Sequence, residues 1–209
     1  MKKYLKLMII TSVVALLPIV AGGIFWSLLP EQLPVHWNTQ GEVDGYTPKP
    51  FAVIGMPLIL LTLQWLGAFT MLADPKHKTH SGKLLQIGFW IIPVLSVVLG
   101  TVTYSVALGY GVRVEVVVPV SLGLLLTVIG NYMPKCRQNY TVGIKLPWTL
   151  HSEENWNRTH RLAGWLWVGG GLITVVTAFF GNVLWSLIPV LIMVLVPTVY
   201  SYILYRKGI

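Results

Sequence analysis

The sequence predicts an all-α, polytopic membrane protein with six transmembrane helices and both termini in the cytoplasm. Hydrophobic residues make up 55% of the 209 residues and charged residues only 11%, whereas soluble domains carry about 25% charged residues. The mean hydropathy is +0.70. Uncharged stretches are long enough to cross a hydrocarbon core, which takes about 20 residues. The Lys and Arg residues fall almost entirely on one side of these stretches, which sets the orientation.

The predicted spans follow the uncharged stretches in chain order. The first four cover residues 7–29, 51–73, 84–108 and 116–131. The stretch 162–205 has no charged residue and is too long for one crossing, and Gly181-Asn182 within it is typical of a tight turn between two spans. Lys2-Lys3 could open a signal peptide, but the apolar run is longer than a 7–15-residue h-region and no A-x-A-like site follows it. We therefore expect the first span to remain as an anchor.

The orientation follows from the cations, because cytoplasmic loops carry the excess of Lys and Arg. Thirteen of the 15 Lys and Arg residues lie on the side of the termini, and only Lys49 and Arg113 lie opposite. The basic pI of 9.7 therefore reflects topology. Direct nucleic-acid binding is not expected, since no soluble basic module or known motif is present. Cys136 is the single cysteine, so no internal disulfide can form.

The predicted outer loop, residues 29–50, is a first candidate site. Its prolines disfavour a helix and its glycines permit turns, so an ordered excursion with an extended piece at 33–37 is expected. One His and two carboxylates, His36, Glu42 and Asp44, match no standard metal spacing, and no metal or cofactor is expected. Alternatively, Trp37 lies at the membrane interface and the polar side chains only hold the loop together. The candidate ligand-binding residues are His36, Trp37, Asn38, Gly41 and Asp44.

The polar loop, residues 131–161, is the second candidate site. Pro147 prevents a helix across its middle. Ser152 is a plausible N-cap, followed by Glu153-Glu154 where the helix dipole favours negative charge. The helix that begins there is expected to carry Trp156 and His160 on one face and to continue into the fifth span. Nearby, Arg158 and Arg161 could bind lipid phosphate, pair with the glutamates or receive an acidic partner.

These segments carry a resemblance to a known family. The polar loop holds Asn131-Tyr132-Met133-Pro134-Lys135, Gly143-Ile144-Lys145, Pro147-Trp148-Thr149-Leu150 and Trp156 followed by Thr159-His160-Arg161. This pattern resembles the signature of the SdpI family of bacterial membrane proteins. The segment Leu33 to Asn38, followed by Gly41 and Asp44, is similar to a small domain of unknown function that precedes this signature. One departure is Lys145-Leu146 in place of Arg-Thr, and Lys cannot reproduce a bidentate Arg contact.

The resemblance implies a two-helix unit at 1–80 with the outer loop, and a four-helix SdpI-type unit at 81–209. The candidate residues of the polar loop have either a partner-binding or a structural role. They are Asn131, Pro134, Lys135, Arg137, Asn139, Gly143, Lys145, Pro147, Trp148, Thr149, Trp156, Thr159, His160 and Arg161.

The resemblance also implies a function in immunity and signal transduction at the bacterial plasma membrane. The expected partners are a secreted peptide toxin outside, a winged-helix repressor inside, and membrane lipid. Coupling the two faces would need a rearrangement of the helices. Prolines within the spans interrupt the helices and could permit bending, and glycines allow close helix approach, although both are common in transmembrane helices. These residues are Pro57, Pro93, Pro119, Pro189, Pro197, Gly100, Gly169, Gly170 and Gly171.

An intramembrane enzyme or a small-solute transporter is the alternative. Transporters often show buried charge or inverted repeats, but Glu115 is the only acidic candidate near a span for such a charge, and no repeat is evident. A catalytic site would have to be assembled from polar-loop residues, namely His151, Glu153, Glu154 and His160. We expect no catalytic residues and a protein that is not an enzyme.

Overall fold

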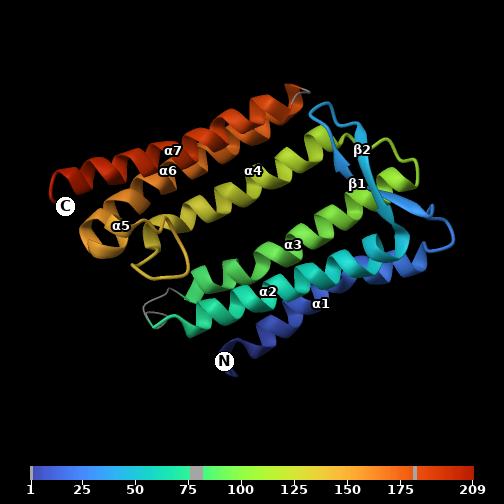
Figure 1. Ribbon diagram of the computed structural model, residues 1–209, viewed down its shortest axis with the longest axis horizontal. Coiled ribbons are helices and arrows are strands. Elements are labelled where there is room, and N and C mark those ends of the chain that lie inside the picture. The colour runs from blue at the N-terminus through green and yellow to red at the C-terminus, as the bar shows by residue number, and fades with distance from the viewer. Residues whose placement is uncertain (1, 76–81, 181–182) are drawn as a thin grey trace. The chain divides into compact units, whose positions relative to one another are not determined.

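The structure is a computed structural model that describes residues 2–75, 82–180 and 183–209 (Figure 1). Within these residues six helical segments are long and apolar enough to cross a membrane. The chain is mostly helical, as predicted, with one small two-stranded sheet. The long helices are α1 (Lys2–Ile24), α2 (Met56–Ala73), α3 (Gly82–Ala107), α4 (Val114–Tyr132), α6 (Glu153–Thr177) and α7 (Val183–Arg206).

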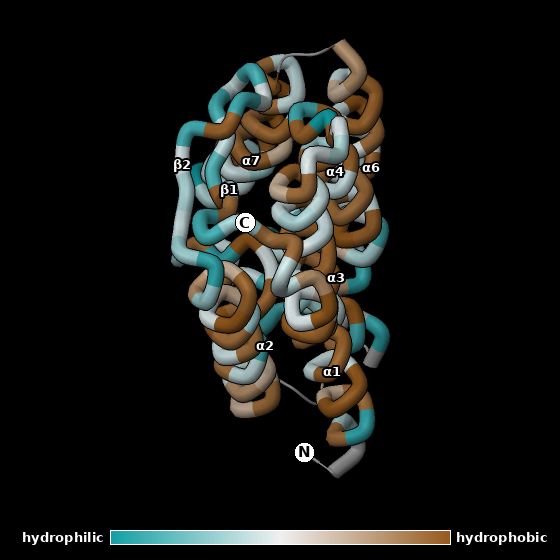
Figure 2. Tube along the Cα trace, turned by 90° about the vertical axis from the view of Figure 1, so that its right-hand side faces the viewer, coloured by the Kyte–Doolittle hydropathy of each residue, from teal (hydrophilic) through white to brown (hydrophobic). Residues whose placement is uncertain are grey.

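Short elements connect the long helices. They are β1 (Gln32–Trp37), β2 (Val43–Pro48), the π-helix η1 (Phe51–Gly55), α5 (Pro147–His151), and the 3-10 helices η3 (Met133–Lys135) and η4 (Ala178–Phe180). Hydrophobic residues predominate along the helices, and hydrophilic residues gather in the β1–β2 hairpin (Figure 2).

The helix boundaries refine the predicted spans. The first helix ends at Ile24, before residue 29, because residues 25–29 form turns in which Leu29 N–H donates to Phe25 O. Ser152 is the N-cap of α6, and its hydroxyl accepts a hydrogen bond from Asn155 N–H, as predicted. The same helix continues into the fifth span without interruption. The predicted turn at Gly181-Asn182 and the cations Lys76 and Lys78 lie outside the described residues.

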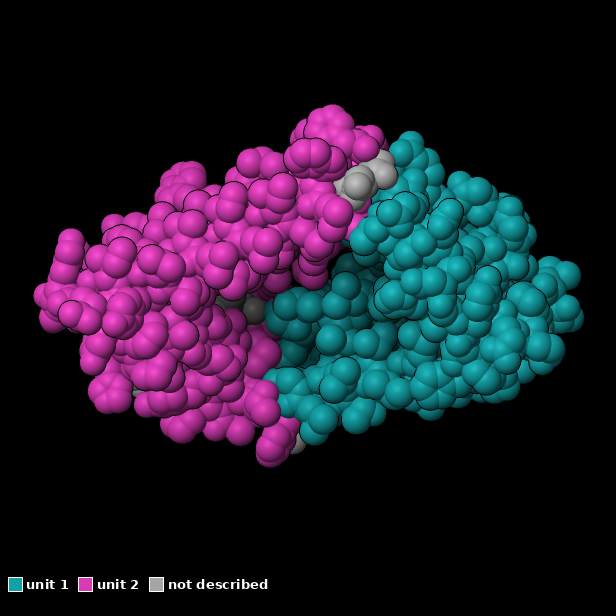
Figure 3. Space-filling model, turned by 45° about the horizontal axis from the view of Figure 1, so that its top comes forward, with its two compact units in different colours: residues 1–68, 88–118 teal, residues 69–87, 119–209 magenta. Residues whose placement is uncertain are grey.

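The chain forms two compact units, residues 1–68 with 88–118 and residues 69–87 with 119–209 (Figure 3). The predicted division near residue 80 was based on sequence motifs. The boundaries of the structural units differ from this division because the C-terminal part of α3 packs against α1. Ser96 Oγ donates to Ala15 O, and Tyr104 OH donates to Pro18 O. Most of α2 belongs to the first unit, and its last turn belongs to the second.

Polar contacts tie the helices of the first unit together inside the apolar layer. The Gln64 amide donates to Thr11 Oγ1 at 2.7 Å, and Trp65 Nε1 donates to Ser12 Oγ at 3.1 Å. Such side-chain hydrogen bonds between membrane helices contribute about 0.6–2 kcal/mol each. Pro57 is the second residue of α2, just after η1, and has no N–H for the Val53 carbonyl, which accounts for the widened π turn at this position.

The outer loop is an antiparallel β-hairpin that covers the ends of the first unit's helices. The extended piece predicted at 33–37 is confirmed as part of β1, and its partner β2 was not anticipated. Leu33 is fully buried in a cluster that joins the hairpin to α1, η1 and α3, with Leu29, Ala52, Val53 and Tyr104 as the other buried members. This packing orders the loop, since the hairpin alone would be marginal in water.

Glycines bring the helices of the second unit into close contact. A Cβ at Gly171 of α6 would lie 2.6 Å from Gly123 O of α4, and one at Gly130 would lie 2.6 Å from Trp167 Cβ. Gly170 packs on Met193 of α7 and, in the first unit, Gly100 packs on Pro18, so close approach is confirmed at Gly100, Gly170 and Gly171. The prediction of close helix approach was wrong for Gly169, because no atom of the described residues lies within 4 Å of a Cβ placed there.

The orientation is open to a labelling test. In intact cells, Glu42→Cys at the exposed hairpin tip should react with a membrane-impermeant maleimide, because the cation distribution places this loop outside. Glu153→Cys, exposed in the polar loop, is the matched control and should react only after permeabilisation. The native Cys136 is 4% exposed, so its background signal should be small. Labelling of position 42 only in permeabilised cells would reverse the orientation.

Candidate functional site

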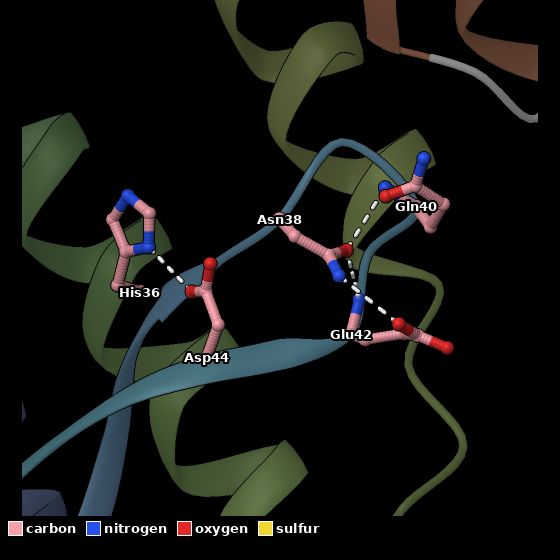
Figure 4. A network of polar contacts seen from close by, with 5 residues as sticks. All are labelled: His36, Asn38, Gln40, Glu42 and Asp44. Carbon is pink, nitrogen blue, oxygen red and sulfur yellow. Dashed lines mark hydrogen bonds and ion pairs between the residues drawn. The ribbon is translucent and has the colours of Figure 1, made fainter.

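The tip of the outer hairpin is organised by a single asparagine (Figure 4). Asn38 Oδ1 accepts hydrogen bonds from Gln40 N–H at 2.9 Å and Glu42 N–H at 3.0 Å, while Asn38 Nδ2 donates to Glu42 Oε2. Asparagine side chains bond their own backbone two residues on in turns of this kind. Gly41 adopts φ +84°, which favours glycine. The Asn and Gly of the motif therefore shape the turn.

His36 and Asp44 form a hydrogen-bonded pair across the two strands. The Nδ1 atom of His36 lies 2.5 Å from Asp44 Oδ1, and their side chains are 72% and 44% exposed. In Figure 4 the second ring nitrogen of His36 points away from Asp44. A carboxylate that holds one histidine nitrogen orients the ring and leaves the other nitrogen for a further partner. This pair is the most exposed ordered polar feature among the predicted outer residues.

The tip of the hairpin rests on the start of α4. A Cβ at Gly41 would lie 2.6 Å from Glu115 Oε2, and Glu115 Oε1 accepts a hydrogen bond from Arg113 Nε at 3.2 Å. The first turn of α4, held by Arg113 just before it, thus supports the tip. The half-buried Trp37 has its Nε1 atom enclosed without a hydrogen-bond partner. Its proposed place at the membrane interface stays a prediction.

The polar loop has a core of its own. Five of the predicted residues are buried in this core, and they are Asn139, Thr149, Trp156, Thr159 and His160. Asn139 Oδ1 accepts from Val142 N–H at 2.7 Å and from Thr141 N–H at 2.9 Å, and its Nδ2 donates to Val142 O and Arg137 O. Satisfying this many backbone groups holds the segment 137–142 in one conformation.

Trp156 and His160 are the centre of this core. They lie one turn apart on α6, as predicted, and their rings stack with centroids 4.0 Å apart. Trp156 Nε1 donates to Cys136 O at 2.7 Å. His160 Nδ1 lies 2.8 Å from Trp156 O, and Nε2 accepts from Ile144 N–H at 3.0 Å, so the ring is neutral with its proton on Nδ1. Gly143, with φ +118°, packs closely against both rings. A Cβ at this position would collide with His160.

Trp148 and Thr149 anchor α5, where Pro147 is the first residue. Trp148 Nε1 donates to Ser201 Oγ at 2.9 Å, and the indole stacks on Tyr205 of α7. Thr149 Oγ1 donates to Ile144 O and accepts from Leu146 N–H, which caps the helix. Trp148 thus attaches the polar loop to α7, and Thr149 closes the start of α5.

The exposed predicted residues of the polar loop form a separate set. They are Asn131, Pro134, Lys135, Arg137, Lys145, Pro147 and Arg161. Lys135 lies over the Tyr132 ring, Lys145 Nζ donates to Thr141 O, and Arg158 pairs with Glu154, which was one of its three predicted roles. A soluble partner could reach this set, whereas it could not reach His160.

Three of the four residues of the alternative catalytic site make other contacts, and the fourth, Glu153, is exposed. Both nitrogens of His160 bond to backbone groups, Nδ1 of His151 lies 3.1 Å from Pro147 O, and Glu154 is paired with Arg158. A general base needs a free nitrogen or carboxylate within reach of a substrate proton. In residues 2–75, 82–180 and 183–209 no cluster of three His, Cys, Asp or Glu side chains could hold a metal ion.

Sequence reasoning missed three polar residues that hold the polar loop, two of them buried and one, Gln138, partly buried. Asp74 is 3% exposed and its Oδ2 accepts from Tyr140 N–H and Thr141 Oγ1–H, both at 2.9 Å. Gln138 Nε2 donates to Thr149 O and Leu150 O. Asn155 is fully buried and donates to Ser201 O. A helical pattern could have revealed Asn155, because it lies one turn before Thr159 on α6 and beside Trp156. No local pattern could have revealed Asp74, because its partners lie 66 and 67 residues away in the sequence.

Both candidate sites fall within matches to described families. The domain of unknown function DUF1648 matches residues 13–61, which include the hairpin. The SdpI/YfhL protein family matches residues 135–201, which include most of the polar loop. A relative from Bacillus subtilis (strain 168), named "Immunity protein SdpI", is 27% identical over 206 residues, covering 97% of this chain and 98% of the relative. The chain is thus similar to the SdpI/YfhL family in its C-terminal part and to this immunity protein over nearly its whole length.

The similarity to the Bacillus subtilis relative covers more of the chain than either family match. Because the alignment with the Bacillus subtilis relative runs through nearly the whole length of both proteins, the SdpI/YfhL likeness extends over all six candidate spans. No solved structure matches this chain.

Proposed function

We propose that this chain is an immunity protein of the bacterial plasma membrane that protects its cell against a secreted peptide toxin. The near full-length similarity to Immunity protein SdpI carries this proposal. The outer hairpin is the surface that would meet the toxin, because His36 and Asp44 are exposed on a rigid support. A preorganised surface loses little conformational entropy when a ligand binds. The protein acts by binding and not by catalysis.

The proposal includes a second, inward step. A soluble winged-helix repressor would approach the cytoplasmic face, where the exposed cations Lys135, Arg137, Lys145 and Arg161 are available to an acidic surface. Charged groups of this kind raise the association rate and the specificity of a complex more than its affinity. Arg161→Ala should therefore weaken signalling while leaving protection in place.

Protection should depend on the His36–Asp44 pair. His36→Ala removes the ring whose second nitrogen could bond the toxin, and Asp44→Ala removes the carboxylate that orients this ring. Loss of one such hydrogen bond, worth about 0.5–1.5 kcal/mol, should lower toxin affinity by about two- to tenfold. The measurement is survival of a sensitive strain that expresses each variant, challenged with a peptide toxin that an SdpI-family protein resists. Thr39→Ala is the control, since this exposed tip residue bonds only to its neighbour Gln40.

Membrane levels of all three variants are compared by immunoblot. Normal survival of both pair variants at wild-type level would mean that the pair only shapes the hairpin. Loss of protection in Thr39→Ala as well would indicate a general effect on the tip.

A further inference from the structure

The second helix connects the two candidate sites along the chain. Only Lys49 and Pro50 separate β2 from η1, and η1 continues directly into α2. At its other end, α2 stops at Ala73, and the next residue is Asp74. One continuous helical segment thus begins at the outer hairpin and ends at a residue that holds the polar loop.

The outer end of this segment is fastened by a buried lysine. Lys49 is 5% exposed, and its Nζ donates to Leu29 O at 2.9 Å and to Trp26 O at 3.3 Å. The same amino group pairs with Glu31 at 2.8 Å. These carbonyls follow the end of α1, where a cation is favourable. Displacement of the hairpin would therefore move the beginning of η1.

The inner end is fastened by the buried carboxylate of Asp74. It accepts hydrogen bonds from the backbone of Tyr140 and the hydroxyl of Thr141. Asn139 locks the same segment internally through Thr141 N–H and Val142 N–H, so a pull on residues 140 and 141 moves the segment as a whole. Breaking the contacts of a buried carboxylate is costly, which makes this attachment firm.

We propose that α2 is the element that transmits a change in the outer hairpin to the polar loop, with Asp74 as the positioning residue at its inner end. A helix is stiff along its axis, and helix shifts of about 1–2 Å are common in switching proteins. Such a shift is enough to break hydrogen bonds of 2.9 Å. The π turn at η1 is a place where the helical register can change, as π turns often lie at functional sites.

The biological purpose of this relay rests on the proposed function, but the experiments that test the relay do not. Cys136 is an internal reporter, because it lies in the core of the polar loop and receives a hydrogen bond from Asn139 Nδ2. Burial raises the pKa of its thiol to about 11, with the Asn139 hydrogen bond opposing the shift. The thiolate is the reactive form, so the intact loop should react slowly with a maleimide at neutral pH.

The first measurement is the alkylation rate of Cys136 in the full-length protein in detergent. Asp74→Ala should raise this rate at least tenfold, and Thr141→Val, which removes only the hydroxyl donor, should raise it several-fold. Thr62→Val is the matched control: its hydroxyl bonds within α2 to Leu58 O, and its rate should stay within twofold of wild type. Unchanged rates in both Asp74→Ala and Thr141→Val would overturn the role of Asp74.

The second measurement tests transmission with a double-mutant cycle. Lys49→Met loosens the outer end and should raise the Cys136 rate several-fold in the wild-type background. It should have no further effect when combined with Thr141→Val, if α2 acts on the loop through this attachment. Independent, multiplicative effects, or no effect of Lys49→Met alone, would overturn the relay. No toxin is used, so failure of the immunity proposal would leave this result unaffected.

Discussion

Replacing Trp156 by alanine should lower the free energy of unfolding by about 3–5 kcal/mol, the cost typical of removing a large buried aromatic side chain. Trp156 is fully buried, stacks on His160 and donates to Cys136 O. The cavity would open in the core of the polar loop, where Gly143 and Cys136 pack. The loss should appear as a lower unfolding temperature in detergent, followed with a fluorogenic maleimide that reports exposure of Cys136.

Trp165→Ala is the matched control for this substitution. Trp165 lies on the same helix but is 76% exposed, so its removal should change stability by about 0.5 kcal/mol or less. Equal effects of the two substitutions would mean that the polar loop is loosely packed and that its signature residues are not structural.

The second expected result is a pair of opposite effects from two neighbouring glycines. Gly171→Ala should destabilise the protein by about 1–3 kcal/mol, because the new methyl group would meet Gly123 O and Thr127 on α4. Gly169→Ala should stabilise it by up to about 1 kcal/mol, since that position is open and alanine is the better helix former. Both are measured as unfolding temperatures in detergent.

The comparison between these glycines separates packing from bending. If the glycines of α6 served mainly as a hinge, stiffening either position would have similar consequences. A destabilising Gly169→Ala would contradict the assignment of that position to open space. A neutral Gly171→Ala would mean that α4 and α6 can separate without loss of stability.

The helices could be predicted because their causes are local in the sequence. A run of about 20 uncharged residues is sufficient for a membrane span, and Ser152 with two following glutamates is sufficient for a helix start. The sequence predicted only the first strand of the hairpin, as an extended piece at 33–37. The second strand, β2, was missed because it contains Gly45 and ends at Pro48, and both residue types are uncommon in strands. What makes β2 a strand is its pairing with β1.

The roles of the motif residues depended on contacts that no local pattern contains. The sequence alone determined the membrane class, the helix positions, the Trp156–His160 pairing at one turn and the family resemblance. Only the tertiary structure decided that Asn139 and His160 belong to a buried core while Lys145 and Arg161 stay accessible. It alone brought Asp74 to Thr141 and Gly41 to Glu115. The physical reason is that burial and long-range hydrogen bonds depend on which helices meet, and closing a loop of more than 60 residues leaves no periodic signal in the chain.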